Sequence, residues 1–275
     1  MTEVGFAEGR YLYCVVDASG PGAERDGERA DREGVDAARE FSPEGIEGGE
    51  PYVVGSDGVG AVVQPRGEPF DSDDLRRVKR WLLAHQRVVD AAGQAFGTPL
   101  PFRFDTIHEG DDDAVREWLR SERDALRANL DAFAGKWEYR VTLTVDGEFD
   151  PDDEELSDLR ARIDAAGEGE AFLLEKQYER RLTDLERERD DRLAADLRER
   201  LAPLVADVEP VESGGVLDEG PAGNRVTGLA LLAQREQESA IGSELDEVVA
   251  DPDLDVEFTG PWPPYSFAPE LGGSG

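Results

Sequence analysis

The stretch WEYRVTLTV, residues 137–145, alternates between apolar and polar side chains at every position. The odd-numbered residues are aromatic or aliphatic and comprise Trp137, Tyr139, Val141, Leu143 and Val145. The even-numbered residues are polar and comprise Glu138, Arg140, Thr142 and Thr144. Because successive side chains of a β-strand point to opposite faces, this pattern predicts a long strand with one face buried and the other in solvent.

The residues after this strand predict a βαββαβ order, which is the split-βαβ or ferredoxin-like arrangement. The expected elements are a helix at 151–166, a helix at 171–201, strands at 204–210 and 225–232, a helix carrying Ile241, Leu245 and Val248, and a strand at 254–259. The centre of the second helix, RERDD at 187–191, is highly charged. We therefore expect the first two helices to project from the domain as a helical hairpin.

The residues before this strand predict a variant of the same arrangement. Apolar residues recur every three or four positions from Leu75 to Phe96, which predicts a helix whose apolar stripe includes His85. A second helix is expected between the acids at 111–113 and Gly135. The expected strands are Tyr11–Val16, Tyr52–Val54, Val59–Val63 and Leu100–Phe104.

Together these patterns predict an α+β protein of two domains. Residues 1–135 are expected to form a ferredoxin-like variant, and residues 136–275 a βαββαβ ferredoxin-like domain with the projecting hairpin. Residues 18–44 are rich in glycine, arginine and acids and carry almost no apolar anchors. Such a segment buries too little surface to offset its ordering entropy, so we expect a disordered acidic insert.

Charge is the outlier of the composition. The 275 residues include 64 acidic and 30 basic ones, a formal net charge of −34. Repulsion on this scale destabilises a compact chain unless salt screens it, so we interpret the charge as an adaptation of the whole surface to concentrated salt. It argues against nucleic acid as a partner. Without a signal peptide or a long apolar run, the sequence predicts a soluble cytoplasmic protein that has no membrane contact.

Candidate catalytic residues are few. His85 lies on the apolar stripe of its helix, where a hydrogen-bonded core histidine is more common than a base or a ligand. His108, in DTIHEG, is expected in a loop, and a hydrolase that uses His108 with a nearby carboxylate is a less favoured alternative. The single cysteine, Cys14, lies in YLYCVV and is expected to be a buried strand thiol.

Other motifs point away from catalysis and metal binding. The acidic clusters at 71–74 and 150–155 lack the alternation of a calcium loop, and GSDGVG at 55–60 has the spacing of a hairpin turn. The sequence contains no H-E-x-x-H, G-x-S-x-G or phosphate-loop signature. We therefore expect no catalytic, cofactor-binding or metal-binding residues, and no enzyme activity.

The chain closes with a rigid aromatic segment, GPWPPYSF at 260–267. Its prolines lack backbone donors, so they are expected to end the preceding strand at Thr259 and to keep the chain extended. We expect this C-terminal strap to fold back on the junction of the two halves and to bury Trp262, Tyr265 and Phe267. The alternative is an exposed docking peptide, because PWPP has the P-x-x-P spacing of polyproline ligands.

Six segments resemble the GvpF/GvpL family of gas vesicle accessory proteins in their order and spacing. They are YLYCVV, GVGAVV, the helix with His85, LPFRFDT, GKWEYRV and TGPWPPYSF. The last is the most specific, since its composition is rare and its position at the C-terminus fits the family. The length and acidity are more similar to haloarchaeal GvpL than to the shorter GvpF. Members of the family usually have a glycine where this chain has Asp105.

The resemblance implies a non-enzymatic accessory protein in gas vesicle assembly. Family members are minor vesicle components or act early in vesicle formation, where they contact the shell protein GvpA and other accessory Gvp proteins and limit GvpA aggregation during nucleation. Such a role needs exposed apolar surface and strand edges instead of a catalytic cleft. The alternative from another class is a ferredoxin-like regulatory module that binds a small molecule between two sheets.

Overall fold

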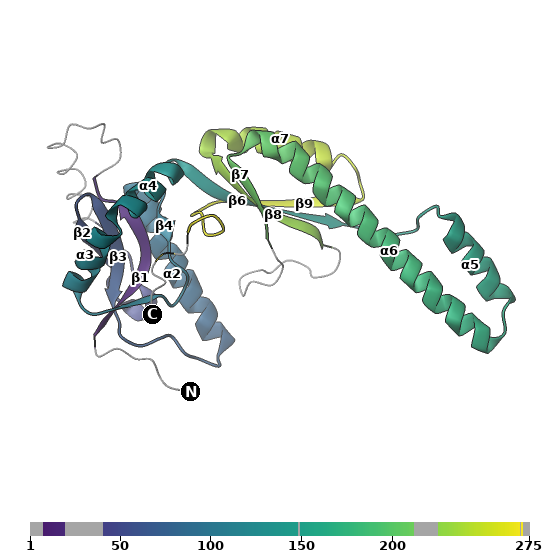
Figure 1. The fold of residues 1–275 in the computed structure, drawn as a ribbon, viewed down its shortest axis with the longest axis horizontal. Coiled ribbons are helices and arrows are strands. Elements are labelled where there is room, and N and C mark those ends of the chain that lie inside the picture. Colours follow the sequence, from purple (N-terminus) through teal and green to yellow (C-terminus); the bar gives the residue numbers. More distant parts are fainter. Residues whose placement is uncertain (1–7, 20–40, 148, 212–224, 270, 272–275) are drawn as a thin grey trace.

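The computed structural model describes residues 8–19, 41–147, 149–211, 225–269 and 271, which form an α+β architecture with two antiparallel sheets (Figure 1). The first sheet has the order β2-β3-β1-β4, with β5 also paired to β1, and the second has the order β7-β8-β6-β9. The strands are β1 (Gly9–Asp17), β2 (Tyr52–Ser56), β3 (Val59–Pro65), β4 (Leu100–Pro101), β5 (Ile107–Glu109), β6 (Lys136–Val145), β7 (Asp207–Pro210), β8 (Arg225–Gln234) and β9 (Leu254–Trp262). The helices are α2 (Leu75–Phe96), α3 (Asp112–Ser121), α4 (Arg123–Phe133), α5 (Glu154–Ala165), α6 (Glu168–Leu201) and α7 (Glu238–Val248), and short 3-10 turns occupy Ile46–Gly48, Ala202–Leu204 and Arg235–Gln237.

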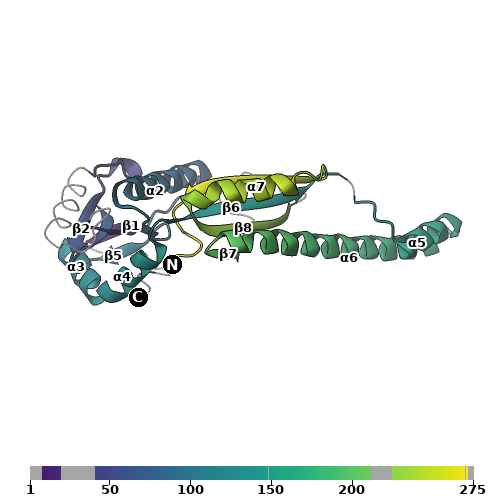
Figure 2. The same cartoon turned by 90° about the horizontal axis from the view of Figure 1, so that it is seen from above.

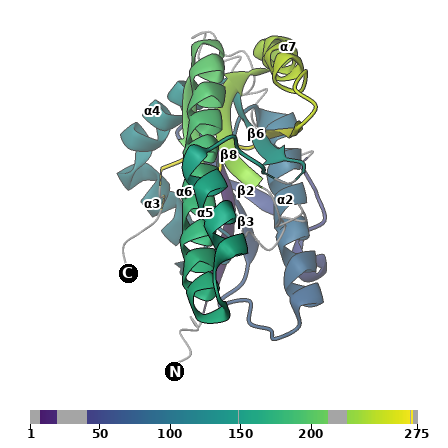
Figure 3. The same cartoon turned by 90° about the vertical axis from the view of Figure 1, so that its right-hand side faces the viewer.

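Helices cover both faces of the first sheet, so its central strand β1 is buried on each side. Tyr11 and Tyr13 pack with α2, whereas Leu12 and Val15 pack with α3 and α4. Figure 3 shows α2 and the α3–α4 pair on opposite sides of this sheet. Cys14 is fully buried in β1, and burial raises the pKa of its thiol.

The segment between α2 and β6 differs from the prediction in two ways. The strand expected at 100–104 pairs only at Leu100 and Pro101, after which the chain turns at Asp105 and pairs again as β5, so His108 lies in a strand and not in a loop. The single helix expected before Gly135 is broken at Glu122. The break lets α3 pack on β2 and β3 while α4 packs on β1, β3 and β4.

In the second sheet, β6 lies between β8 and β9, and the elements run β6-α5-α6-β7-β8-α7-β9, with a pair of helices in place of the first helix of the βαββαβ order. The face of β6 that carries the apolar, odd-numbered residues packs beneath α7 and the C-terminal part of α6. The prediction that the polar, even-numbered residues face solvent is wrong for Glu138, which is 0% exposed. The C-terminal strap covers this residue, because the backbone and side chain of Ser266 bond to its carboxylate.

Helices α5 and α6 form a hairpin that projects away from both sheets (Figures 1 and 2). At 1.5 Å per residue, the 34 residues of α6 span about 51 Å. Its last turns pack on the second sheet through Leu193, Leu197 and Leu201. The N-terminal part of α6 packs on α5, so the hairpin is an arm joined to the sheet at one end.

Most of the predicted acidic insert, residues 20–40, lies outside the described residues. Phe41, inside the predicted range of 18–44, packs on the core between α2 and the first sheet, named here the first core. Its ring lies 5.5 Å from that of Phe96. The packed side of α2 is also turned slightly from the predicted stripe, since Trp81 and Val88 are buried and Leu75 is 74% exposed.

Candidate functional site

His85 lies in the aromatic core between α2 and the first sheet. Its Nδ1 atom is 2.7 Å from the hydroxyl of Tyr11, and its ring stacks on Tyr13 at 5.3 Å. Burial lowers the pKa of His85 to about 4, which keeps the imidazole neutral near pH 7. These contacts place His85 in the core.

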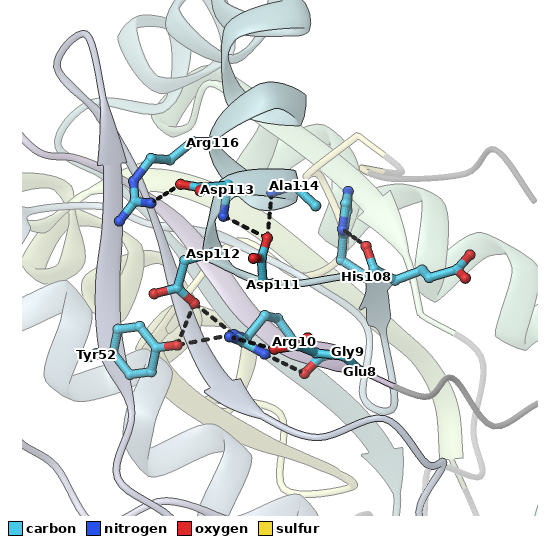
Figure 4. A network of polar contacts seen from close by, with 11 residues as sticks. Glu8, Gly9, Arg10, Tyr52, His108, Asp111, Asp112, Asp113, Ala114 and Arg116 are labelled. Carbon is cyan, nitrogen blue, oxygen red and sulfur yellow. Dashed lines mark hydrogen bonds and ion pairs between the residues drawn. The ribbon is translucent and has the colours of Figure 1, made fainter.

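His108 lies on the opposite side of the first sheet, where its ring is 6.0 Å from that of Trp118 in α3. Its Nδ1 atom is 2.9 Å from the carbonyl oxygen of Glu109. The carboxylate of Asp111 caps α3, accepting from the backbone of Asp113 and Ala114 at 3.0 and 3.1 Å (Figure 4). One of the carboxylates near His108 is therefore engaged at the start of a helix.

Asp112 joins α3 to two strands of the first sheet. The guanidinium of Arg10 on β1 and the hydroxyl of Tyr52 on β2 each donate to its Oδ1 atom at 2.6 Å (Figure 4). Partial burial opposes ionisation of Asp112, but these two hydrogen bonds outweigh it and lower the pKa of the carboxyl. The network fixes the position of α3 on the sheet.

The two acidic clusters also act at helix starts. Asp74 caps α2 by accepting from Arg76, and Asp153 caps α5 by accepting from Leu156, each at 2.9 Å. Within the described ranges, no group of three or more histidine, cysteine, aspartate or glutamate residues has the arrangement of a metal site.

The C-terminal strap begins inside the second sheet. Strand β9 continues past the predicted stop at Thr259, and Trp262 pairs with Glu138 after a register shift. Gly260 makes this possible with φ of 130°, and a Cβ atom there would lie 2.9 Å from the carbonyl oxygen of Glu138. Pro261 is tolerated because β9 is an edge strand, where a backbone donor is not needed on the outer side.

The strap then crosses to the first core, at the junction that the sequence predicted. Tyr265 packs against that core, with its ring 6.4 Å from His85 and its hydroxyl oxygen buried. The prediction is wrong for Trp262, which is 38% exposed. Trp262 lies on the outer face of an edge strand, in the same row as Glu138 and Leu232, so no helix covers it.

Glu138 joins the strap to β6. Its carboxylate accepts from the backbone N–H of Ser266 at 2.7 Å, from the Ser266 hydroxyl at 3.0 Å and from Arg140 at 2.9 Å. Nearby, Gly93 of α2 faces Trp137 of β6 so closely that a Cβ atom would lie 2.9 Å from the indole ring. The two halves therefore meet through α2, the start of β6 and the strap.

The hairpin has a small core of its own. Leu156, Leu159 and Leu174 are buried between α5 and α6. An ion pair of 2.6 Å between Arg181 and Asp153 crosses the two helices and lowers the pKa of the aspartate. The outer side of α6 remains uncovered.

The fold and these sites can be compared with known proteins. The family model described as gas vesicle synthesis protein GvpL/GvpF matches residues 9–269. The chain belongs to the GvpL/GvpF family. It is 41% identical to gas vesicle protein L1 of Halobacterium salinarum, over 97% of this chain and 92% of that protein. It is 38% identical to gas vesicle protein L of Haloferax mediterranei, over 96% of this chain and 89% of that protein.

Solved structures support the fold of this GvpL/GvpF family member. The crystal structure of GvpF from Anabaena sp. PCC7120 has a TM-score of 0.64 and 20% identity, with 96% of this chain and 97% of that chain covered. GvpF from Microcystis aeruginosa has a TM-score of 0.62 and 16% identity, with 95% and 99% covered. The resemblance seen in the six sequence segments is thus confirmed, including the likeness to haloarchaeal GvpL.

Family membership associates this protein with gas vesicles, and its relatives are named as gas vesicle proteins and not as enzymes. Within the described ranges, no helix combines the length and the apolar character that crossing a bilayer requires.

Asp105 stands at a position where the backbone favours glycine. Its φ of 69° lies in the left-handed region, which glycine adopts freely and aspartate tolerates better than most residues. Its carboxylate accepts from the backbone of Phe70 at 2.9 Å, and its own N–H donates to Tyr11 at 3.3 Å. The side-chain hydrogen bond offsets part of the backbone strain.

Proposed function

We propose that this protein is a non-enzymatic accessory protein in gas vesicle assembly. It binds the shell protein GvpA and other accessory Gvp proteins during nucleation, and it remains a minor component of the vesicle. It acts in the cytoplasm, in association with the gas vesicle. The observation that supports this proposal is the hairpin of α5 and α6, an arm that projects from both sheets and exposes large apolar side chains.

An arm of this kind adds little to either core. Away from the last turns of α6, its buried leucines, Leu156, Leu159 and Leu174, pack only between α5 and α6, while Phe172 and Leu173 stay 58% and 62% exposed. Exposed apolar surface on a highly charged protein is typical of an interaction site. A partner-binding role accounts for both features, since the arm places apolar groups where a large assembly can reach them.

The edges of the second sheet favour the hairpin over strand addition as the binding element. One edge, β7, has four residues and ends at Pro210. The other edge, β9, carries Pro261 within its pairing and continues into the strap. Short edge strands, and edge strands that contain proline, are poor templates for an added strand.

We also propose that residues 1–135 and 136–275 are two domains, the first a ferredoxin-like variant and the second a βαββαβ ferredoxin-like domain. The order β7-β8-β6-β9, with all neighbours antiparallel, supports this description of the second half. The start of β6 at Lys136 supports the position of the boundary.

The test replaces residues 151–187 with a short glycine–serine bridge. The ends can be joined, because the guanidinium of Arg189 lies 4.5 Å from the ring centre of Phe149. The variant is returned to a vesicle-forming cell that lacks the wild-type gene. We expect a folded protein that fails to support vesicles and no longer retains GvpA on co-purification.

The matched control removes residues 21–39, which the sequence predicts to be dispensable for folding. We expect this variant to support vesicles. Normal vesicles without the hairpin, together with normal GvpA retention, would show that the proposed function is wrong.

A further inference from the structure

The outer side of α6 near the tip of the hairpin has an unusual composition. Successive residues of an α-helix are about 100° apart, so residues separated by three, four, seven or eleven positions share a side. Leu174, Tyr178 and Leu185 lie on the side that faces α5. The opposite side is named here the tip face; it carries Phe172, Leu173, Lys176, Arg180, Thr183 and Arg187 and is bordered by Glu179 and Asp184.

The tip face is open to solvent along its length. Besides the two apolar residues, the side chains of Lys176 and Arg187 are 58% and 68% exposed, and Arg180 is exposed. The tip face is therefore apolar at the end of the arm and basic along its shaft.

The three basic groups can be recruited by a partner. Among the residues that the structure describes, Lys176 and Arg187 pair only with exposed acids of the same helix, Glu179 and Asp184, and pairs of this kind contribute little to stability. Within the described ranges, Arg180 makes no hydrogen bond or ion pair. On a chain with a net charge of −34, such a face is a place where an acidic partner meets attraction instead of repulsion.

We propose that the tip face docks an acidic amphipathic helix of another protein. The proposal rests on the proposed function of the hairpin as a binding arm and specifies the chemistry of its partner. The apolar side of the partner helix covers Phe172 and Leu173. Its carboxylates pair with Lys176, Arg180 and Arg187.

The spacing of the basic groups favours a helix as the partner. They lie four and seven residues apart, about 6 and 10.5 Å along the axis. A helix lying alongside has the same rise, so glutamates at positions i, i+4 and i+11 on one side meet all three groups. An extended strand rises about 3.3 Å per residue and offers no such match.

Two other occupants are disfavoured by charge. A second copy of this chain brings another net charge of −34 to the contact. An anionic lipid surface is broad and meets the flanking acids Glu175, Glu179 and Asp184 as well as the basic groups, whereas a single helix can place its carboxylates opposite the basic groups alone.

The chain offers a matched control on α2. Arg76, Arg80 and Arg87 are exposed and repeat the spacing of four and seven residues. The exposed leucines of α2, Leu75 and Leu83, are eight positions apart, so they form no adjacent apolar pair like that of the tip face.

The test measures binding of synthetic helices to the full-length chain by fluorescence anisotropy, in salt that keeps the chain folded. One probe carries leucine along one side and glutamate at positions i, i+4 and i+11, and the other has lysine in place of glutamate. We expect the glutamate probe to bind more tightly. Its Kd should rise about tenfold in Lys176→Glu/Arg180→Glu/Arg187→Glu and in Phe172→Ser/Leu173→Ser. The charge reversal on α2, Arg76→Glu/Arg80→Glu/Arg87→Glu, should leave the Kd unchanged.

Several outcomes overturn the proposal. They are equal binding of both probes, no binding of the glutamate probe, and an equal loss in the α2 reversal. Self-association, or sedimentation with anionic phospholipid vesicles, that is abolished by Phe172→Ser/Leu173→Ser also overturns it in favour of a second copy or a lipid surface. Circular dichroism checks that each variant is folded. None of these results depends on vesicle formation, so they are separate from the test of the proposed function.

Discussion

Carboxylate pairs at the strap junction and on the hairpin use the same chemistry in different surroundings. Glu138 is fully buried and bonds to a residue 128 positions away in the sequence, as well as to Arg140. On the outer side of the hairpin, Lys176 pairs with Glu179 only three residues away, and both side chains are more than half exposed. Water and salt compete with the contact between Lys176 and Glu179 and not with the contact between Glu138 and Ser266.

This difference separates stability from binding within one chain. Loss of the Glu138 carboxylate removes three hydrogen bonds from an acceptor that is closed to water, whereas loss of an exposed partner lets water replace it. We therefore expect substitutions at the junction to unfold the protein and substitutions on the hairpin to change its interactions. The predictions below test this division, from the largest expected effect to the smallest.

Glu138→Ala should lower the free energy of unfolding by about 3 kcal/mol, because Ser266 and Arg140 lose their shared buried acceptor. Urea melts in concentrated KCl measure the change. The matched control is Glu257→Ala, an exposed carboxylate on the same side of the sheet. Equal urea midpoints for the two variants would contradict the prediction, because Glu138 would then matter no more for stability than an exposed carboxylate.

Tyr265→Ala should cost about 2 kcal/mol, since its ring packs on the first core. Trp262→Ala should cost about half as much, because its side chain is partly exposed. Tyr265→Phe should cost nothing, as the buried hydroxyl has no hydrogen-bond partner among the described residues. A greater loss in Trp262→Ala than in Tyr265→Ala, in the same urea melts, would contradict this assignment.

The junction should also weaken in mild acid through His85. Its pKa is lowered from 6.5 to about 4, so the unfolded chain takes up a proton that the folded chain resists. The contribution of the neutral ring is lost as pH falls below about 6.5, by about 1 kcal/mol between pH 6.5 and 5.5. The difference in unfolding free energy between wild type and His85→Gln should change by this amount. Nitrogen-15 NMR should show a neutral His85 ring at pH 5.5, and a protonated ring there would contradict the prediction.

Asp105→Ala should cost about 1 kcal/mol, because alanine retains the strain of a positive φ and loses the bond to Phe70. Asp105→Gly should cost less, since glycine removes the strain. Thermal melts rank the two variants. The opposite order would show that the hydrogen bond outweighs the backbone strain.

Lys176→Gln on the hairpin should change stability by about 0.3 kcal/mol or less, because its ion pair is exposed. Thermal melts at two KCl concentrations measure the effect, which should shrink further in higher salt. A loss as large as that of Glu138→Ala would mean that hairpin and junction are not energetically separate.

The sequence alone determined the elements whose signals are local. The alternation of residues 137–145 predicted β6, and the three-and-four repeat predicted α2 with the bounds that the structure shows. The projecting hairpin followed from the charge of its centre, and six short segments were enough to indicate the family. Periodicity and charge act within a few residues, so they are readable without the fold.

Only the tertiary structure decided which side chains the strap and the sheets cover. Glu138 had the pattern of a solvent-facing residue and is buried, because Ser266 returns to it from the end of the chain. Trp262 had the composition of a core residue and is partly exposed, because β9 continues through Pro261 as an edge strand. Burial at these positions depends on how distant segments dock, and no local pattern records that arrangement.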